Sequence, residues 1–287
     1  MYDAVIVGSG PAGLSAALYT SRANLKTLVI GKDRGALEKA HRIENYFGMA
    51  EPVSGCELVE NTMTQAKNLG TELAQDEIFH ISWEGHFLLE GKEGSYEARS
   101  VLLATGSQRK SPKIEGLQEL EGRGVSYCAV CDAFFYRGRD VAVLGNEEYA
   151  LHELGELLPV VNSAVLLTNG LEIPQEVPEG VRVVETPIAR IDGSVRVEGV
   201  AFADGTSLKA EGIFVALGSA GAVDLARKLG AITEGPNIRV GEQMETNIPG
   251  LYAAGDCTGG LLQISAAVGE GAKAAMSMIS FVRKQKQ

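Results

Sequence analysis

The sequence has little of what secreted, membrane-spanning and nucleic-acid-binding proteins need. Its 287 residues include only four cysteines, which are too few for a secreted disulfide scaffold. No apolar run approaches the ~18 residues of a membrane span, and no basic segment precedes the first apolar stretch. The formal net charge of −11 leaves no basic excess for a polyanion. We therefore expect a cytoplasmic protein that binds neither membranes nor nucleic acids.

The rest of the composition is that of a globular protein. Apolar residues make up 45% and charged residues 22%, close to the globular averages of roughly 45–50% and 25%, so the chain can bury a core. At about 150 residues per domain, the length predicts two domains. Glycine is the exception, because 35 of 287 residues is about 12%, against an average of about 7%. Such a surplus indicates either many turns or backbone that approaches a ligand closely.

A glycine-rich turn near the N-terminus joins a predicted strand to a predicted helix. Residues 3–7 read DAVIV, a short and mostly apolar run, and residues 8–13 read GSGPAG. Residues 14–19 have helical character, and residues 27–30 form a second strand. In this βαβ context the first glycine makes the turn, the second lets bare backbone reach a pyrophosphate, and the third allows helix–strand packing. The pattern predicts a dinucleotide site at a helix N-terminus, with an ordinary glycine-rich turn as the alternative.

A second unit of the same kind follows in the middle of the chain. A strand at 140–144 ends at Gly145, a helix covers 149–154, and the next strand lies at 164–167. We predict an α/β fold with two Rossmann-like three-layer nucleotide-binding domains, the second inserted in the first. The Gly/Pro-rich stretches near 111–124 and 245–250 are the expected crossings between them. A helix from about 264 to 282 would return to the first sheet.

Cys128 and Cys131 form a C-x-x-C motif, which suits either reversible disulfide chemistry or half of a zinc site. Zinc needs four ligands, whereas Cys56 and Cys257 stand alone and no histidine has ligand spacing. We therefore expect no metal and favour dithiol exchange. Asp132 directly follows the second cysteine and offers a carboxyl group for proton transfer.

These motifs together resemble the low-molecular-weight thioredoxin reductases over essentially the whole chain. The matching segments are GSGPAG at 8–13, IENYFG at 43–48, ATG at 104–106, GRGVSYCAVCDAFFYRGRDVAVLG at 122–145 and IPGLYAAGDC at 248–257. The resemblance implies a homodimeric FAD-dependent pyridine nucleotide-disulfide oxidoreductase of class II that reduces thioredoxin or a similar small protein. It implies an FAD-binding domain at 1–114 and 242–287, and an inserted domain at 115–241 that carries the redox cysteines.

The same resemblance assigns roles to individual residues. The implied FAD-binding residues are Gly8, Ser9, Gly10, Pro11, Ala12, Gly13, Gly31, Asn45, Thr105, Gly106, Gly255, Asp256, Gln263 and Ile264. Residues 8–13 would hold the pyrophosphate, Asp256 would bond the ribityl chain, and the pair at 263–264 would lie near the flavin ring. Cys131 would face the flavin, Cys128 would attack the partner disulfide, and Asp132 would be the acid/base.

The second glycine turn departs from the family pattern. It reads GNEEYA at 145–150, with Glu147 where the family has its middle glycine. A side chain there blocks backbone approach, and each of the two adjacent carboxylates opposes a diphosphate by about 1 kcal/mol or more at ~4 Å. After the following strand the chain has TNGL at 168–171 in place of the arginine cluster that clamps a 2′-phosphate, and 172–180 leaves little room for the usual helix. We therefore expect NADPH to bind poorly.

A thioredoxin reductase without a working NADPH site resembles the pyridine-nucleotide-independent branch, in which reduced ferredoxin delivers electrons to the flavin. We expect electrons to pass from ferredoxin or another non-pyridine donor through FAD to the Cys128–Cys131 disulfide, and on to a thioredoxin-like acceptor. The alternatives are an ordinary NADPH-dependent thioredoxin reductase, a diflavin enzyme with a second FAD in the vacated pocket, and a non-enzymatic flavin redox sensor. The candidate basic clusters for docking an acidic ferredoxin are Arg109-Lys110-Lys113, Arg137-Arg139 and Arg283-Lys284-Lys286.

Overall fold

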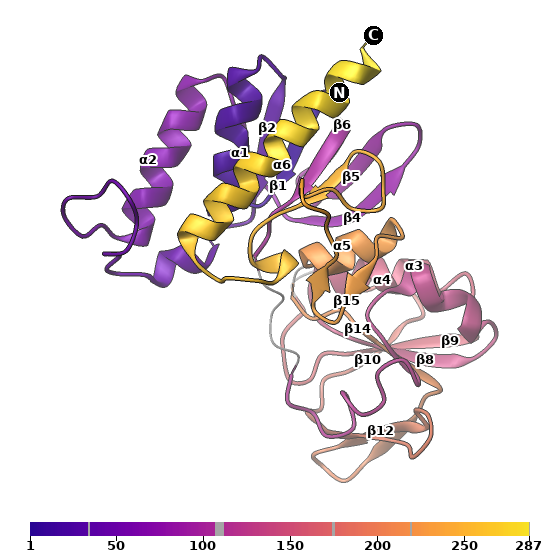
Figure 1. The fold of residues 1–287 in the computed structure, drawn as a ribbon. Coiled ribbons are helices and arrows are strands. Elements are labelled where there is room, and N and C mark those ends of the chain that lie inside the picture. The colour runs from indigo at the N-terminus through magenta and orange to yellow at the C-terminus, as the bar shows by residue number, and fades with distance from the viewer. Residues whose placement is uncertain (34, 107–111, 174–175, 219, 287) are drawn as a thin grey trace. The chain divides into compact units, whose positions relative to one another are not determined.

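The computed structural model describes residues 1–33, 35–106, 112–173, 176–218 and 220–286. The chain divides into two compact units, one made of Met1–Arg109 with Gly221–Gln287 and the other of Lys110–Ala220, inserted between those segments (Figure 1). Each unit contains a sheet with parallel strands and helices. The predicted α/β class is therefore confirmed.

The chain re-enters the first unit at Gly221, whereas the sequence analysis places this crossing at residue 242. The helix α5 (Ala222–Lys228) packs with the first unit, where the N–H of Ala222 donates to Thr105 Oγ1 at 2.9 Å. Lys228 Nζ donates to the carbonyl oxygen of Phe79 at 3.2 Å. These contacts account for the difference between residues 221 and 242 as the point of re-entry. The stretch 245–250, which was expected as a crossing between the domains, lies inside the first unit.

The first unit has a seven-stranded sheet of order β3-β2-β1-β6-β5-β4, with β17 paired to β6. The strands are β1 (Tyr2–Val7), β2 (Thr27–Gly31), β3 (Glu72–Gln75), β4 (Ile78–Trp83), β5 (Phe87–Gly91), β6 (Ser95–Leu103) and β17 (Leu251–Ala253). Strand β6 pairs antiparallel with β5 through its first half and parallel with β1 and β17 through its second half. Since β2 is also parallel to β1, the carboxyl ends of these four parallel strands lie at the same edge of the sheet.

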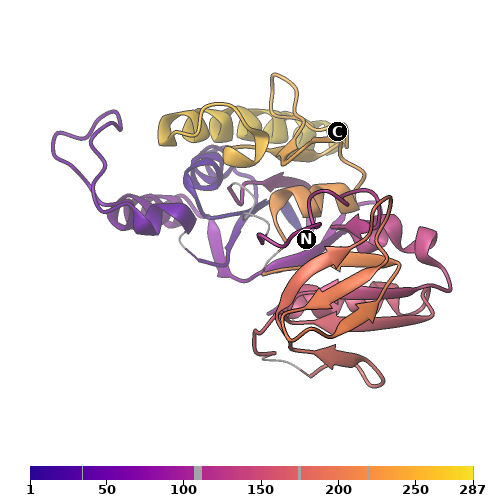
Figure 2. The same ribbon diagram turned by 90° about the horizontal axis from the view of Figure 1, so that it is seen from below.

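Helices of the first unit pack closely on one another. Besides α5, they are α1 (Pro11–Arg22), α2 (Gly55–Asn68) and α6 (Ile264–Gln285), with the 3₁₀ turns η1 (Gly35–Lys39) and η3 (Asp256–Thr258) and the small hairpin β15 (Thr233–Glu234) and β16 (Asn237–Ile238). Helices α1 and α6 lie side by side (Figure 2). Gly271 permits this approach, because a Cβ there would overlap the carbonyl oxygen of Ala12. Ser15 Oγ also donates to the carbonyl oxygen of Val268 at 2.8 Å.

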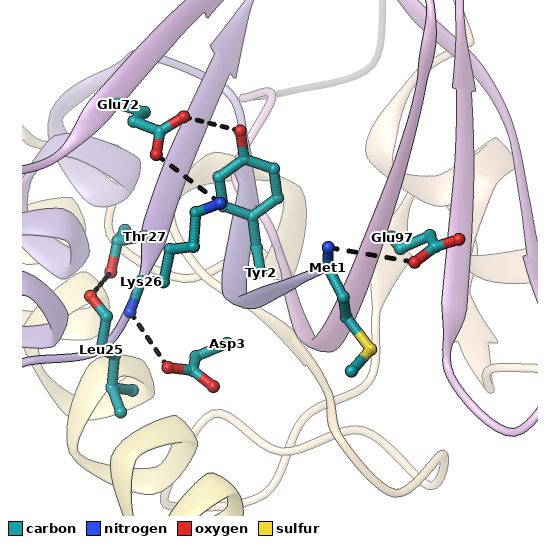
Figure 3. A network of polar contacts seen from close by, with 8 residues as sticks. All are labelled: Met1, Tyr2, Asp3, Leu25, Lys26, Thr27, Glu72 and Glu97. Atoms are coloured by element: carbon teal, nitrogen blue, oxygen red, sulfur yellow. Dashed lines mark hydrogen bonds and ion pairs between the residues drawn. The ribbon is translucent and has the colours of Figure 1, made fainter.

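A polar network surrounds the start of β1 (Figure 3). The Asp3 carboxylate accepts the N–H of Lys26 at 3.0 Å and forms ion pairs with Lys286 Nζ at 2.8 Å and Arg99 Nε at 3.4 Å. Burial acts to raise the pKa of Asp3, but the hydrogen bonds from Lys286 and Lys26 and the nearby positive charges outweigh it and hold that pKa below its usual value. The network therefore ties the end of the chain to the central strand.

The inserted unit has a parallel five-stranded sheet of order β10-β9-β8-β14-β7. Its strands are β7 (Val125–Ser126), β8 (Asp140–Leu144), β9 (Ser163–Leu167), β10 (Arg182–Val184) and β14 (Gly212–Val215), and its helices are α3 (Ala129–Asp132), the 3₁₀ turn η2 (Ala133–Tyr136) and α4 (Glu148–Leu157). A second, antiparallel sheet consists of β11 (Ile188–Asp192), β12 (Gly199–Phe202) and β13 (Ser207–Lys209). One apolar cluster, including Leu144, Leu167 and Val200, joins the two sheets.

None of the helices in the described part of the chain has the length and apolar composition that a bilayer span requires.

Candidate functional site

The predicted cofactor residues gather where parallel strands of the first unit end. Residues 8–13 follow β1, Gly31 ends β2, Thr105 and Gly106 follow β6, and Gly255 and Asp256 follow β17. Open parallel sheets of α/β proteins bind their ligands at the carboxyl ends of the strands. The fold therefore places segments that are distant in sequence at one candidate binding edge.

The turn between β1 and α1 contains glycines of two kinds. Gly8 has a φ of +119°, and a Cβ there would overlap the carbonyl oxygen of Ala104. A Cβ at Gly13 would overlap the carbonyl oxygen of Gly8, so both positions must be glycine for the turn to pack. At Gly10, no described atom lies within 4 Å of the position that a Cβ would take. The bare backbone of Gly10 is therefore open to a ligand.

The start of α1 favours an anionic ligand. Gly10 is the N-cap residue and has no side chain to satisfy the first N–H groups, Pro11 follows it, and the first turn contains no acidic residue. The first N–H groups of a helix lack partners within it and carry partial positive charge, which attracts phosphate. The residues present therefore fit the pyrophosphate of the predicted FAD.

Asn45 and Gln263, both predicted at the flavin, are in contact although 218 residues separate them. Asn45 Nδ2 donates to Gln263 Oε1 at 3.1 Å. Ile264, the first residue of α6, helps to line an apolar pocket of about 100 Å³ together with Tyr46, Leu58 and other residues of α1, α2 and α6.

Two acidic residues near this edge were missed by the sequence analysis. Glu270 on α6 accepts the N–H of Gly255 at 2.7 Å and the hydroxyl of Thr258 at 3.3 Å, which holds the loop carrying Asp256. Asp33 lies after β2, about 20 residues beyond Gly13, the spacing at which an acid meets the ribose of a bound dinucleotide. That spacing could have identified Asp33, whereas no local pattern points to Glu270.

Cys128 and Cys131 form a disulfide, as expected for a redox pair. Cys128 is the N-cap residue of α3, and its Sγ accepts the N–H of Cys131 at 3.2 Å. Cys128 is only 3% exposed, whereas Cys131 is exposed. For Cys128 to attack a partner disulfide, as predicted, it must first become accessible. The described residues contain no cluster of three or more His, Cys, Asp or Glu side chains placed to hold a metal.

Asp132 lies next to the redox pair through Ser126, which the sequence analysis did not single out. Ser126 Oγ donates to Asp132 Oδ2 at 2.6 Å. Ser126 Oγ also accepts the N–H of Cys128 at 3.1 Å. Ser126 therefore connects the half-buried carboxyl group to the backbone of Cys128. This arrangement is compatible with the predicted acid/base role of Asp132.

Helix α4 also holds the redox motif. Glu153 Oε2 accepts the N–H of Ala129, the residue after Cys128, at 2.6 Å. The hydroxyl of Tyr149 donates to the carbonyl oxygen of Tyr127 at 3.2 Å. Both α4 side chains are buried, and neither was expected at the site.

The turn between β8 and α4 keeps one glycine and adds two acids. A Cβ at Gly145 would overlap the carbonyl oxygen of Ala216, so this position requires glycine for packing. Glu147 is the N-cap residue of α4 and makes no side-chain capping bond, and Glu148 lies in the first turn. Asn146 Nδ2 donates to the carbonyl oxygen of Glu172 at 2.8 Å, which ties the turn to the segment that follows β9.

The chain is similar to known proteins over nearly its whole length. The family described as pyridine nucleotide-disulphide oxidoreductase matches residues 2–157 and 175–271. A thioredoxin reductase of Aquifex aeolicus (strain VF5) is 34% identical, with 100% of this chain and 95% of that protein covered. The atypical thioredoxin reductase TRi from Desulfovibrio vulgaris Hildenborough is 39% identical with a TM-score of 0.92, and 99% of each chain is covered. A ferredoxin-flavin thioredoxin reductase from Clostridium acetobutylicum is 31% identical with a TM-score of 0.70, with 100% of this chain and 99% of that chain covered.

Proposed function

The chain belongs to the pyridine nucleotide-disulphide oxidoreductase family as a thioredoxin reductase homologue, and from this premise we propose that it takes electrons from a donor other than a pyridine nucleotide. It is an FAD-dependent oxidoreductase. In the proposed reaction, ferredoxin is the donor and thioredoxin or a similar small protein is the acceptor. A ferredoxin-flavin thioredoxin reductase among the similar structures supports this choice of donor.

The start of α4 is the observation that carries the proposal. Glu147 and Glu148 lie where an NADPH diphosphate would approach, and Asn146 is bonded to the segment after β9. A carboxylate about 4 Å from a phosphate charge costs about 1 kcal/mol in bulk water and about 4 kcal/mol near a protein surface. Since 1.4 kcal/mol is about tenfold in affinity, two such carboxylates weaken NADPH binding by at least roughly tenfold.

The residues of the inserted unit supply the disulfide chemistry. FAD, when bound, lets a one-electron donor serve a two-electron acceptor. The Cys128–Cys131 disulfide takes two electrons and two protons, its S–S bond breaks, and Asp132 is placed to move a proton. One thiolate then attacks the partner disulfide to form a mixed disulfide. The other cysteine displaces the reduced partner and restores the Cys128–Cys131 bond.

An acidic ferredoxin needs local positive charge on a chain whose formal net charge is −11. Of the expected basic residues, Arg139 pairs with Glu211 at 3.0 Å and Lys286 pairs with Asp3 at 2.8 Å. Arg283 and Lys284 are exposed on the last turn of α6, whereas residues 109 and 110 lie outside the described part of the chain. We therefore propose Arg283 and Lys284, at the end of α6, as candidates for donor docking.

An anaerobic reduction experiment tests the proposed donor. The purified holoenzyme is mixed with excess NADPH or NADH, or with dithionite-reduced ferredoxin from which dithionite has been removed, and the visible flavin band is followed. We expect rapid bleaching with ferredoxin alone, followed by reduction of thioredoxin. Cys131→Ser should keep the bleaching and lose thioredoxin reduction, because the disulfide cannot form.

Other outcomes of this experiment would replace the proposal. Rapid, stoichiometric bleaching by NADPH or NADH would restore the ordinary pyridine-nucleotide enzyme. Two flavins per chain would indicate the diflavin enzyme, and bleaching without any reduction of a protein disulfide would indicate the redox sensor. Each of these readouts is independent of the others.

We also propose that the enzyme is a homodimer in the cytoplasm, where thioredoxin systems keep thiols reduced. The first unit carries exposed apolar side chains, including Phe47 at 95% exposure, Leu261 and Leu262. A second copy that covered such residues would remove apolar surface from water. Light scattering after gel filtration should give twice the chain mass of 30.4 kDa, and the monomer mass would contradict the dimer.

A further inference from the structure

Glu153 is a buried carboxyl group beside the redox pair that the proposed reaction does not use. It is 1% exposed and projects from α4, and its Oε2 accepts the N–H of Ala129 at 2.6 Å. Ala129 directly follows Cys128 in the chain. Buried carboxyl groups are rare unless they have a partner, so the contact with this particular N–H group calls for an explanation.

The hydrogen bonds around Cys128 show what this contact does. Nearby N–H groups and positive charges stabilise a thiolate, and the Cys128 Sγ accepts one such N–H, from Cys131, at 3.2 Å. The N–H of Ala129 donates instead to Glu153, and the N–H of Cys128 itself donates to Ser126. Glu153 therefore takes up the N–H of the residue that follows Cys128, and a carboxylate at this place would disfavour a negative charge on the Cys128 sulfur.

We propose that Glu153 is a positioning residue that makes the Cys128–Cys131 dithiol a stronger reductant. Reduction converts the disulfide to two thiols by adding two electrons and two protons. A group that disfavours the Cys128 thiolate destabilises the reduced pair relative to the disulfide, and the reduction potential falls. The converse is known for dithiols whose reduced form is stabilised, because these are strong oxidants. The inference rests on the proposed function only in that the cysteine pair must cycle between its two states.

The test uses Glu153→Gln in the holoenzyme. The glutamine oxygen can still accept the N–H of Ala129, while the charge is removed, so position and charge are separated. The matched control is Glu156→Gln, an exposed residue of the same helix. Each protein is equilibrated with dithiothreitol buffers, and the state of the peptide carrying Cys128 is read by alkylation and mass spectrometry, apart from Cys56 and Cys257.

We expect E153Q to raise the equilibrium constant for reduction about tenfold, which is about 30 mV for a two-electron couple. The reduced variant should also alkylate at Cys128 several-fold faster with iodoacetamide at pH 7, because more of the thiol is ionised. E156Q should change neither quantity. An unchanged equilibrium constant and alkylation rate in E153Q would show that Glu153 only anchors the backbone and would overturn the proposal.

A second measurement uses the unmodified protein, so it tests the proposal even if the variant does not fold. If the pH profile of Cys128 alkylation gave an apparent pKa at or below the ~8.5 of free cysteine, the proposal would be wrong. Both measurements use dithiothreitol and iodoacetamide rather than a biological donor. The donor experiment can therefore fail while this inference stands, and the reverse is also possible.

Discussion

The two units contain the same strand–turn–helix device, at β1–α1 and at β8–α4, and the two turns differ in only part of their glycine pattern. Gly8 and Gly145 are both required by packing, since a Cβ at either would overlap a backbone carbonyl oxygen of a neighbouring strand end. Gly10, by contrast, borders open space, and Glu147 stands at the corresponding place in the second turn. The first glycine of each turn is therefore required by the packing of the fold, whereas the residue at the middle position affects whether the backbone is open to a ligand.

The helices that follow these turns differ in charge as well. The first turn of α1 has no acidic residue, whereas that of α4 contains Glu148 after the N-cap Glu147. Helix α4 also contributes Glu153 to the redox motif, so it has a structural task that does not depend on a nucleotide. Helix α4 would therefore keep a structural role in a unit that bound no pyridine nucleotide, as we propose for this one.

The largest expected effect comes from giving the first turn the acid of the second. Gly10→Glu should weaken FAD binding by roughly five- to thousandfold, because a carboxylate about 4 Å from a phosphate costs about 1 to 4 kcal/mol. The fold should persist, since no described atom lies within 4 Å of the added Cβ. Flavin absorbance per chain after gel filtration, together with circular dichroism, measures both.

The control for this variant is Gly155→Glu, which adds the same side chain at an exposed position of α4 that also has open space. It should retain a full complement of FAD. A Gly10→Glu protein that also kept stoichiometric FAD would show that the bare backbone of this turn does not face the cofactor.

A smaller effect is expected on the stability of the first unit, when the carboxylate of Asp3 is removed. Asp3→Asn removes the carboxylate that pairs with Lys286 and Arg99, and we expect a loss of about 1–2 kcal/mol in unfolding free energy at pH 7 because Lys286 is half exposed. The folded pKa of Asp3 is lowered, so its contribution is present above the unfolded value of ~3.9 and is lost as the pH falls through the folded value. The difference between the proteins should therefore become smaller as the pH is lowered below the unfolded value.

Urea unfolding at pH 7 and at pH 3, followed by the fluorescence of Trp83, measures this loss, since Trp83 is the single tryptophan and lies in the first unit. Asp204→Asn is the matched control in the inserted unit, where hydrogen bonds from Thr206 lower the pKa of an exposed carboxyl group. That variant should leave the Trp83 transition unchanged. An equal loss for Asp3→Asn at both pH values would mean that the ion pairs are not its cause.

Local patterns predicted the repeated elements well, and tertiary contacts explain what they missed. The strand at 140–144 has the expected bounds because an apolar run that ends in a packing glycine is a local signal. The structure groups residues 221–241 with the first unit, and nothing within residues 222–228 indicates in the sequence that Lys228 reaches the carbonyl of Phe79. Glu153 was missed for the same reason, since its partner Ala129 lies 24 residues away and is met only when α4 packs on the redox motif.

The smallest expected effect tests how far the second turn can be returned toward the first. Glu147→Gly removes one carboxylate and exposes backbone, which should tighten NADPH binding by about 1 kcal/mol, roughly fivefold. Glu148 and the bond from Asn146 to Glu172 remain, so flavin bleaching by NADPH should become measurable but stay slow. Titration calorimetry gives the affinity and anaerobic absorbance the rate, with Glu156→Gln as the control on the same helix. Full NADPH turnover in Glu147→Gly would mean that this one side chain separates the two turns. No gain at all would mean that the tie to the segment after β9, rather than charge, keeps the nucleotide out.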